Sequence, residues 1–181
     1  MRIIGGRYRN RRIDPPKDID ARPTTDFARE GLFNILHHAL PLEGLAVLDL
    51  FAGTGAVSAE FLSRGAEKVV SVEMDRLLNS HLLRLARDLD DPGWRIVKAD
   101  VFQFLRGHQG TYDIIFADPP FRLPGTEELP TLVREAGLLS SDGTLIVEHP
   151  KDIDLHTDPW FRRQRDYGTV QFSFFSPADR P

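Results

Sequence analysis

The feature that most constrains the fold is a repeated switch in hydrophobic pattern after Gly44, from short apolar runs to helical periodicity and back. The run at 45–51 is almost continuously apolar, which is typical of a strand covered on both faces. Alternating βα units that finish in an antiparallel hairpin around Gly168 predict an α/β fold with one three-layered, doubly wound and mostly parallel sheet. The expected strands are 45–51, 68–73, 94–97, 112–117, 144–148, 161–167 and 169–175, and the expected helices after Gly44 lie near 56–64, 77–89, 101–105 and 127–136.

Length and composition narrow the classes of function. A chain of 181 residues, 41% hydrophobic and 28% charged, is long enough for one domain with a sizeable core. The absence of cysteine excludes disulfides and thiolate chemistry. We find no secretory signal and no apolar run long enough to span a bilayer, so we expect a cytoplasmic protein without a membrane partner.

The amino-terminal segment is charged oppositely to the rest of the chain. Residues 1–12 contain Arg2, Arg7, Arg9, Arg11 and Arg12 and no acid, so they carry +5 while the remainder carries −9. We expect residues 1–22 to form a basic arm or hairpin and residues 23–181 to form the main domain. A basic segment on an acidic body can hold phosphates. The same residues equally suit a solvated arm or an edge hairpin, so both readings stay open.

A helix is expected after the linker at 14–18. Thr24 or Thr25 can cap it, and Pro41 ends it. The side chains expected on its apolar face are Phe27, Leu32, Ile35, Leu36 and Ala39.

A glycine turn follows the first strand of the sheet. Gly53 and Gly55 allow a close approach of the backbone to a ligand, although two glycines also suit a simple tight connection. Asp49, Glu73 and Asp100 lie near the ends of three strands, and ligands bind at that edge in doubly wound sheets. Any one acid can instead cap a helix, and Asp100 is the best candidate for that role.

The nature of the ligand follows from two departures from a dinucleotide-binding turn. The third glycine of that fingerprint is replaced by Ser58, and Asp49 would repel a pyrophosphate. A ligand that contains adenosine but no phosphate fits better. S-adenosylmethionine is such a molecule.

The fourth strand of the sheet runs directly into Asp118-Pro119-Pro120-Phe121. The two prolines stiffen the turn. The Asp118 carboxylate and the Pro119 carbonyl can accept hydrogen bonds from an exocyclic amine, while Phe121 can stack on the ring that carries it. A rigid turn would explain the two prolines by themselves. Asp-Pro-Pro-Phe taken together with the glycine turn upstream indicates methyl transfer to a nucleobase nitrogen.

These motifs resemble those of the class I S-adenosylmethionine-dependent methyltransferases. Residues 2–11 and Arg22-Pro23-Thr24-Thr25-Asp26 further resemble the bacterial family, of the RsmD type, that methylates N2 of a guanine in small-subunit ribosomal RNA. The resemblance implies a seven-stranded Rossmann-like sheet in a methyltransferase domain at 23–181. It also implies cofactor contacts from Asp49, Phe51, Gly53, Gly55, Glu73, Met74, Asp100, Val101 and Thr25, catalysis by Asp118, Pro119, Pro120 and Phe121, and RNA contacts from Arg2, Arg7, Arg9, Arg11, Arg12 and Arg22.

Other readings remain open. Asp-Pro-Pro-Phe also suits methylation of adenine N6 in DNA or RNA or of a protein glutamine amide, and a nucleotide-binding module without catalysis is a third reading. The RNA partner is either naked ribosomal RNA or an assembled or assembling small subunit. No histidine pair has zinc-ligand spacing, so we expect no metal and read all six histidines as structural or solvated.

Overall fold

The computed structural model describes residues 1–16, 26–121 and 123–177. The sheet predicted from the sequence is present, with strands close to the expected positions. The helices are α1 Asp26–Ala39, α2 Ala56–Ser63, α3 Arg76–Leu89, α4 Val101–Gly107 and α5 Leu129–Ala136, the last preceded by a 3-10 turn, η1 Thr126–Glu128. The strands are β1 Ala46–Leu50, β2 Lys68–Val72, β3 Trp94–Val97, β4 Tyr112–Ala117, β5 Leu139–Pro150, β6 Phe161–Tyr167 and β7 Val170–Phe175.

The seven strands form one sheet in the order β3-β2-β1-β4-β5-β7-β6. Strands β1 to β5 pair in parallel, and β7 pairs antiparallel with both β5 and β6. The order reverses between β1 and β4, which is the point where ligands bind in open α/β sheets. The predicted doubly wound sheet ending in an antiparallel hairpin is therefore confirmed.

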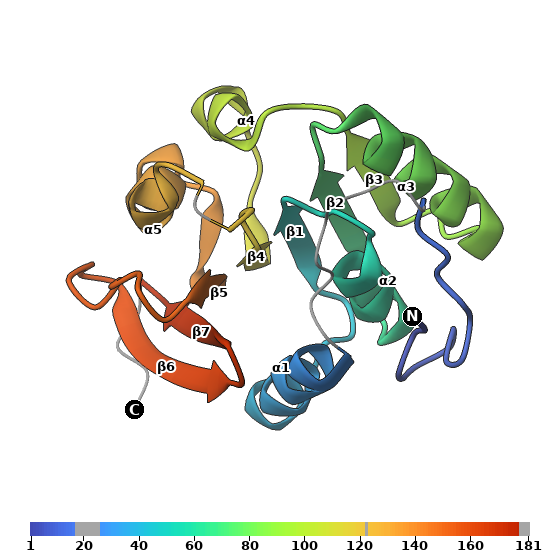
Figure 1. The fold of residues 1–181 in the computed structure, drawn as a ribbon, viewed down its shortest axis with the longest axis horizontal. Helices are drawn as coiled ribbons and strands as arrows, with labels where there is room; N and C mark the ends of the chain where they lie inside the picture. The colour runs from blue at the N-terminus through green and yellow to red at the C-terminus, as the bar shows by residue number, and fades with distance from the viewer. Residues whose placement is uncertain (17–25, 122, 178–181) are drawn as a thin grey trace.

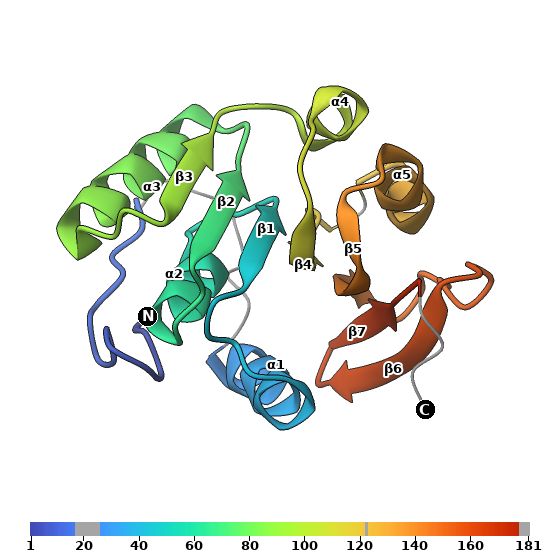
Figure 2. The same cartoon turned by 180° about the vertical axis from the view of Figure 1, so that it is seen from behind.

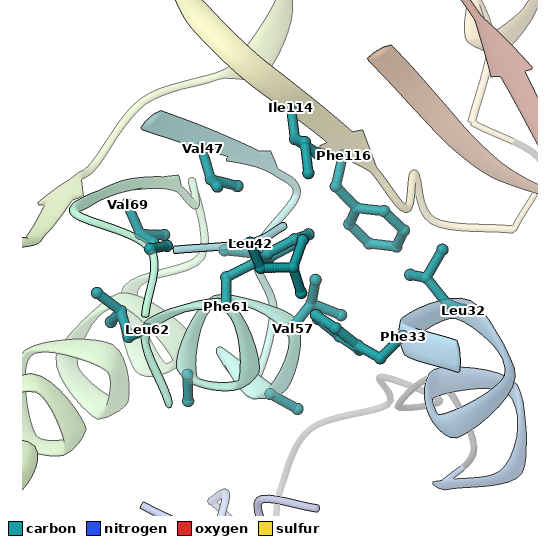
Figure 3. Close-up of a cluster of buried hydrophobic side chains, with 14 of the residues drawn as sticks. Leu32, Phe33, Leu42, Val47, Val57, Phe61, Leu62, Val69, Ile114 and Phe116 are labelled. Atoms are coloured by element: carbon teal, nitrogen blue, oxygen red, sulfur yellow. The ribbon is translucent and has the colours of Figure 1, made fainter. Parts of the chain in front are cut away.

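Helices cover both faces of the sheet, with α4 and α5 on the opposite side from α1 and α2 (Figures 1 and 2). Successive residues of a strand point to opposite faces, so β1 sends Val47 to one core and Leu48 to the other. On the α1 and α2 side, Phe33 of α1 packs edge to face on Phe61 of α2, with ring centroids 4.7 Å apart. Figure 3 shows both side chains in the apolar layer between these helices and the sheet. This packing fixes α2, which starts directly after the glycine turn.

Two expectations need correction. The buried face of α1 is Ala28, Arg29, Leu32, Phe33 and Leu36, whereas Phe27 is 69% exposed. The expected apolar face and the observed buried face of α1 share Leu32 and Leu36, so the periodicity of apolar residues did not distinguish one face from the other.

Strand β5 also starts earlier than expected. Leu139 pairs with Tyr112, and the register then shifts before Thr144 pairs with Ile114. The polar stretch at 140–143 hid this first part of the strand from a search for apolar runs. No helix within the described ranges is long and apolar enough to cross a membrane.

Candidate active site

The carboxyl ends of the central strands meet at one edge of the sheet. Leu50 at the end of β1 lies level with Val72 of β2 and Ala117 of β4. Because each strand ends there, the residues that follow, Glu73 and Asp118, lie near Asp49 of β1. The electrostatic effect of both carboxylates on Asp49 shows this proximity. The structure therefore brings together three acids that are separated in the sequence.

The glycine turn after β1 has an unusual backbone. Phe51 (φ 61°), Gly53 (φ 53°) and Gly55 (φ 75°) all adopt the left-handed conformation. For a bulky residue such as Phe51 this conformation is strained, and such strain concentrates at ligand sites. A side chain at Gly55 would also meet Leu82 of α3, because its Cβ would lie 2.4 Å from the leucine Cδ2. Gly55 is thus required both by its dihedral angle and by the closeness of α3.

Two side chains hold the turn in this shape. The Glu73 carboxylate accepts hydrogen bonds from the backbone N–H of Gly53 at 2.9 Å and of Asp75 at 2.8 Å. The ring of His81 lies 3.2 Å from the carbonyl of Thr54, and burial lowers the pKa of His81, so its neutral Nε2–H donates. Each Glu73 oxygen retains a lone pair for a ligand. The first turn of α2 has no side-chain cap, which leaves its amide groups facing the same edge.

A chain of buried hydrogen bonds runs beneath the turn and ends at Asp49. The indole N–H of Trp94 donates to Ser71 at 2.8 Å, the two serine hydroxyls lie 2.6 Å apart, and Ser58 donates to the Asp49 carboxylate at 2.5 Å. Ser58 gives its one hydroxyl proton to Asp49, so Ser71 donates to Ser58, and both hydroxyl protons point toward Asp49. The chain spans β3, β2, α2 and β1, so it fixes the carboxylate in one orientation.

Burial raises the pKa of the Asp49 carboxyl to about 7, against the hydrogen bond from Ser58, which lowers it. The carboxylates of Asp118 and Glu73 raise it further. A buried acid of this kind is stabilised in its charged form by a positively charged ligand.

Three further residues of the expected cofactor set, Met74, Asp100 and Val101, follow β2 and β3 at the same edge. Asp100 caps α4, with its Oδ1 accepting the Gln103 N–H at 2.9 Å, so the capping role foreseen for it is confirmed. Its Oδ2 has no partner among the described residues. Met74 is 62% exposed, whereas Val101 is buried at the start of α4.

The Asp-Pro-Pro-Phe segment leaves β4 at this edge. The Asp118 N–H points to the Leu50 carbonyl at 3.4 Å, which ties the segment to β1. Phe121 is 57% exposed, in contrast to the buried phenylalanines of the core. A large aromatic ring left in solvent next to a ligand-binding edge is available for stacking.

The arginine-rich segment forms a hairpin that lies alongside α2 and α3 (Figures 1 and 2). The Glu60 carboxylate of α2 accepts the backbone N–H of Ile4 and Gly5, both at 2.8 Å. Ser63 accepts from the N–H of Tyr8 at 2.9 Å. A Cβ at Gly6 would lie 1.8 Å from the Ser63 carbonyl, so the hairpin can approach α2 only with glycine there.

The arginines of this hairpin fall into two groups. Arg7 forms an ion pair of 2.6 Å with the buried Asp91, and Arg11 donates to the Asp88 carbonyl at 2.7 Å. All five side chains are exposed, but Arg2, Arg9 and Arg12 differ in their partners: their side-chain hydrogen bonds and ion pairs with described residues are limited to a 3.7 Å pair between Arg12 and the exposed Asp14. Arg22 and Thr25 lie outside the described residues.

Sequence reasoning did not identify Glu60, Ser58 or Ser71. Glu60 had a usable signal, because it is the one acid in the otherwise uncharged segment 56–63, and a buried acid requires partners. The two serines had no such signal. No group of three or more histidine, cysteine, aspartate or glutamate side chains in the described ranges is placed so that it could hold a metal ion.

The fold and the edge site together define the class of protein. A 3-2-1-4-5-7-6 sheet with a glycine turn after β1 and Asp-Pro-Pro-Phe after β4 is the Rossmann-like fold of class I methyltransferases. Residues 1–176 match the family described as Conserved hypothetical protein 95, and the chain belongs to this family.

The relatives and solved structures agree with this assignment. Ribosomal RNA small subunit methyltransferase D of Escherichia coli K12 is 35% identical over 178 residues, which cover 97% of this chain and 89% of the relative. The protein of the same name from Haemophilus influenzae is 30% identical over 182 residues, covering 97% and 93%. The solved structure of Escherichia coli yhhF has a TM-score of 0.86 at 34% identity, over 97% of this chain and 96% of that chain. A Thermus thermophilus 16S rRNA N2 methyltransferase, RsmC, in complex with AdoMet and guanosine, shares the fold with a TM-score of 0.70 at 21% identity, over 88% of this chain and 45% of that chain.

Proposed function

We propose that the protein transfers a methyl group from S-adenosylmethionine to the exocyclic N2 amine of a guanine in small-subunit ribosomal RNA. The observation that carries the proposal is the position of Asp118-Pro119-Pro120-Phe121 beside the glycine turn, at the ends of paired strands β4 and β1. The names of the curated relatives support ribosomal RNA as the substrate class. In this proposal, residues 23–181 form the methyltransferase domain and residues 1–22 an RNA-binding extension.

The donor set at the edge fits a cationic ligand that contains adenosine and no phosphate. Asp49 is buried and crowded by two other acids, so an ammonium group would stabilise its charged form. Glu73 would hold the ribose hydroxyls with its remaining lone pairs, and Asp100 with Val101 would frame the adenine. The full proposed cofactor set is Asp49, Phe51, Gly53, Gly55, Glu73, Met74, Asp100 and Val101, together with Thr25.

The catalytic contribution of the protein is mainly positioning. S-adenosylmethionine supplies an electrophilic methyl group on its sulfonium sulfur. An aromatic amine is a poor nucleophile because its lone pair is delocalised into the ring. The Asp118 carboxylate and the Pro119 carbonyl would accept its two hydrogens and aim the lone pair at the methyl carbon. As the new N–C bond formed and the bond from the methyl carbon to sulfur broke, leaving a neutral thioether, the nitrogen would become acidic and its proton would pass to Asp118 or water. Pro120 stiffens the segment, and Phe121 would stack on the base.

The amino-terminal hairpin is the proposed RNA contact. Its charge is +5, whereas the rest of the chain is acidic and repels a phosphate backbone. Arg2, Arg9 and Arg12, whose side chains make no hydrogen bond or ion pair with the described helices, are the first candidates for phosphate contacts, and Arg22 is a further one. Arg7 and Arg11 contribute to the same positive field while they hold the hairpin on the domain.

The test is labelled methyl transfer to deproteinised ribosomal RNA, small subunits, DNA and protein, followed by nucleoside analysis of the product. We expect the label in N2-methylguanosine. Label in N6-methyladenine or in methylglutamine would replace the proposal with one of the other amine-methylating activities. No transfer to any acceptor, together with no cofactor binding, would reject it.

Asp118→Ala separates chemistry from binding. We expect turnover to fall by orders of magnitude, while calorimetry shows S-adenosylmethionine binding close to that of the unmodified protein. The variant's melting temperature serves as the folding control. Turnover near the wild-type level would reject the amine-positioning role.

A further inference from the structure

A cavity of about 330 Å³ lies beside the Asp-Pro-Pro-Phe segment. Its apolar walls are Phe121, Leu123 and Pro124 after β4, Pro150 at the end of β5, and Ile153 just beyond it. Since β4 and β5 are paired neighbours, both loops leave the sheet at the edge that carries Asp118. The volume falls within the range of small-molecule sites, and Phe121 offers an exposed ring as one wall.

Two carboxylates, those of Glu127 and Asp152, complete the lining. Both side chains are exposed, and the described lining residues include no lysine or arginine. These two carboxylates disfavour a phosphate group next to them and favour a base that presents N–H donors. Apolar side chains beside hydrogen-bond acceptors are a lining that suits an aromatic base.

The purine bases differ at the edge that meets such acceptors. Guanine presents an N1–H next to its N2 amine, and a carboxylate beside the base can accept this N1–H while Asp118 and Pro119 hold the amine. Adenine presents an N1 lone pair next to its amine, and a carboxylate facing that lone pair is repelled. A site built around a carboxylate therefore selects guanine both by attraction and by the repulsion of its competitor.

We propose that this cavity is the guanine-selecting pocket. Phe121 stacks on the base there, and Glu127 and Asp152 accept the N1–H of guanine and repel the N1 lone pair of adenine. The inference rests on the proposed function, because it assumes that the base carrying the reacting amine enters beside Asp118. It adds to that function two specificity-determining residues outside the Asp-Pro-Pro-Phe motif. These residues act on which base is accepted and not on the transfer step.

The test compares guanosine with 2-aminopurine riboside, which keeps the 2-amine but has an N1 lone pair in place of N1–H. Affinities are measured by NMR titration of the protein loaded with S-adenosylhomocysteine. We expect guanosine to bind about ten- to hundredfold more tightly, the usual worth of a hydrogen bond to a charged group. In Glu127→Gln/Asp152→Asn the ratio should approach one, because an amide can either accept or donate. Glu128→Gln is the matched control, since Glu128 is exposed on the same turn but does not line the cavity.

Three outcomes distinguish this inference from the proposed function. If the ratio falls in the double variant and stays high in the control, the pocket assignment stands. If the enzyme methylates guanine in RNA but the double variant keeps the wild-type ratio, or guanosine shifts signals away from Phe121 and Ile153, the pocket assignment is wrong and the proposed function stands. If guanosine does not bind and no RNA is methylated, both are rejected.

Discussion

Asp49→Asn should make the protein more stable at neutral pH and weaken its cofactor binding. The side chain of Asp49 is almost fully buried, and its pKa rises from 3.8 to about 7, chiefly because of burial. One pKa unit corresponds to 1.36 kcal/mol, so the ionised carboxylate costs the folded protein about 4 kcal/mol. Asparagine keeps an acceptor for the Ser58 hydroxyl without carrying the charge.

The pH dependence of the difference follows from linkage. Between about pH 4 and pH 7 the folded protein binds the Asp49 proton more tightly than the unfolded chain does, so wild-type stability falls as pH rises through this window. The variant lacks this loss. The free energy of unfolding of the variant should exceed that of the wild type by close to zero at pH 4 and by about 4 kcal/mol at pH 7, and the difference should stay constant above pH 7. Any cost of the new amide hydrogens is an offset independent of pH.

The assay is denaturant unfolding of wild type and variant from pH 4 to pH 8.5, because the difference curve cancels every other titrating group. Thermal unfolding gives a second measurement. A stabilisation of 1 kcal/mol raises the melting temperature of a chain of this size by about 2–4 °C, so the melting temperature of the variant at pH 8 should be higher by about 10 °C. Asp88→Asn, at an exposed acid, is the control and should show no such pH-dependent gain. A difference curve that is flat with pH would refute the desolvation argument.

The same variant tests the proposed contact of Asp49 with the cofactor. Loss of a charged partner for an ammonium group should weaken S-adenosylmethionine about ten- to hundredfold at pH 8. In the wild type, binding at pH 6 should release a proton, seen as a dependence of the calorimetric enthalpy on buffer. Unchanged affinity in the variant would reject the contact while leaving the stability argument intact.

Further substitutions test the hairpin and the proposed stacking of Phe121 on a base. Glu60→Ala should destabilise the protein by about 2–5 kcal/mol in urea unfolding, because two backbone N–H groups and Arg64 lose a buried acceptor; an unchanged midpoint would contradict this. Arg7→Ala should lower the melting temperature through its ion pair with a buried acid, whereas Arg9→Ala should leave it unchanged and reduce the salt slope of RNA binding by about 0.7. If Arg9→Ala lowered the melting temperature and Arg7→Ala reduced the salt slope instead, the roles given to these two arginines would be wrong. Phe121→Ala should weaken base binding in NMR titration by about 1–3 kcal/mol, and Phe121→Tyr should be tolerated; equal losses in both would count against stacking.

The sequence was informative about the sheet and its edge because both depend on short-range pattern. Apolar runs such as 45–51 mark strands, and the ends of parallel strands meet wherever the strands pair. That reasoning placed Asp49, Glu73 and Asp118 at one edge before any contact was known, and the structure brings them together. It did not determine their chemical roles.

The buried hydrogen-bond chain was beyond sequence reasoning. Its successive partners are separated by 9, 13 and 23 residues, and each lies on a different element. Whether Ser58 and Ser71 meet depends on the register of β1 with β2 and on the rotation of α2, which local patterns do not encode. Phe27 illustrates the same limit for helices, since its place in the apolar repeat did not bury it.

Helix α2 links the two halves of the proposed activity. Its first turn follows Gly55 at the proposed cofactor site, and its last turn holds the hairpin through Glu60 and Ser63. Eight helical residues span only about 12 Å, and every one of them is buried. The hairpin therefore cannot shift without moving the glycine turn or breaking buried hydrogen bonds. If the exposed arginines hold RNA phosphates as proposed, α2 sets a fixed distance from those phosphates to the methyl donor. That distance, together with the pocket beside Phe121, would limit which guanine can reach Asp118.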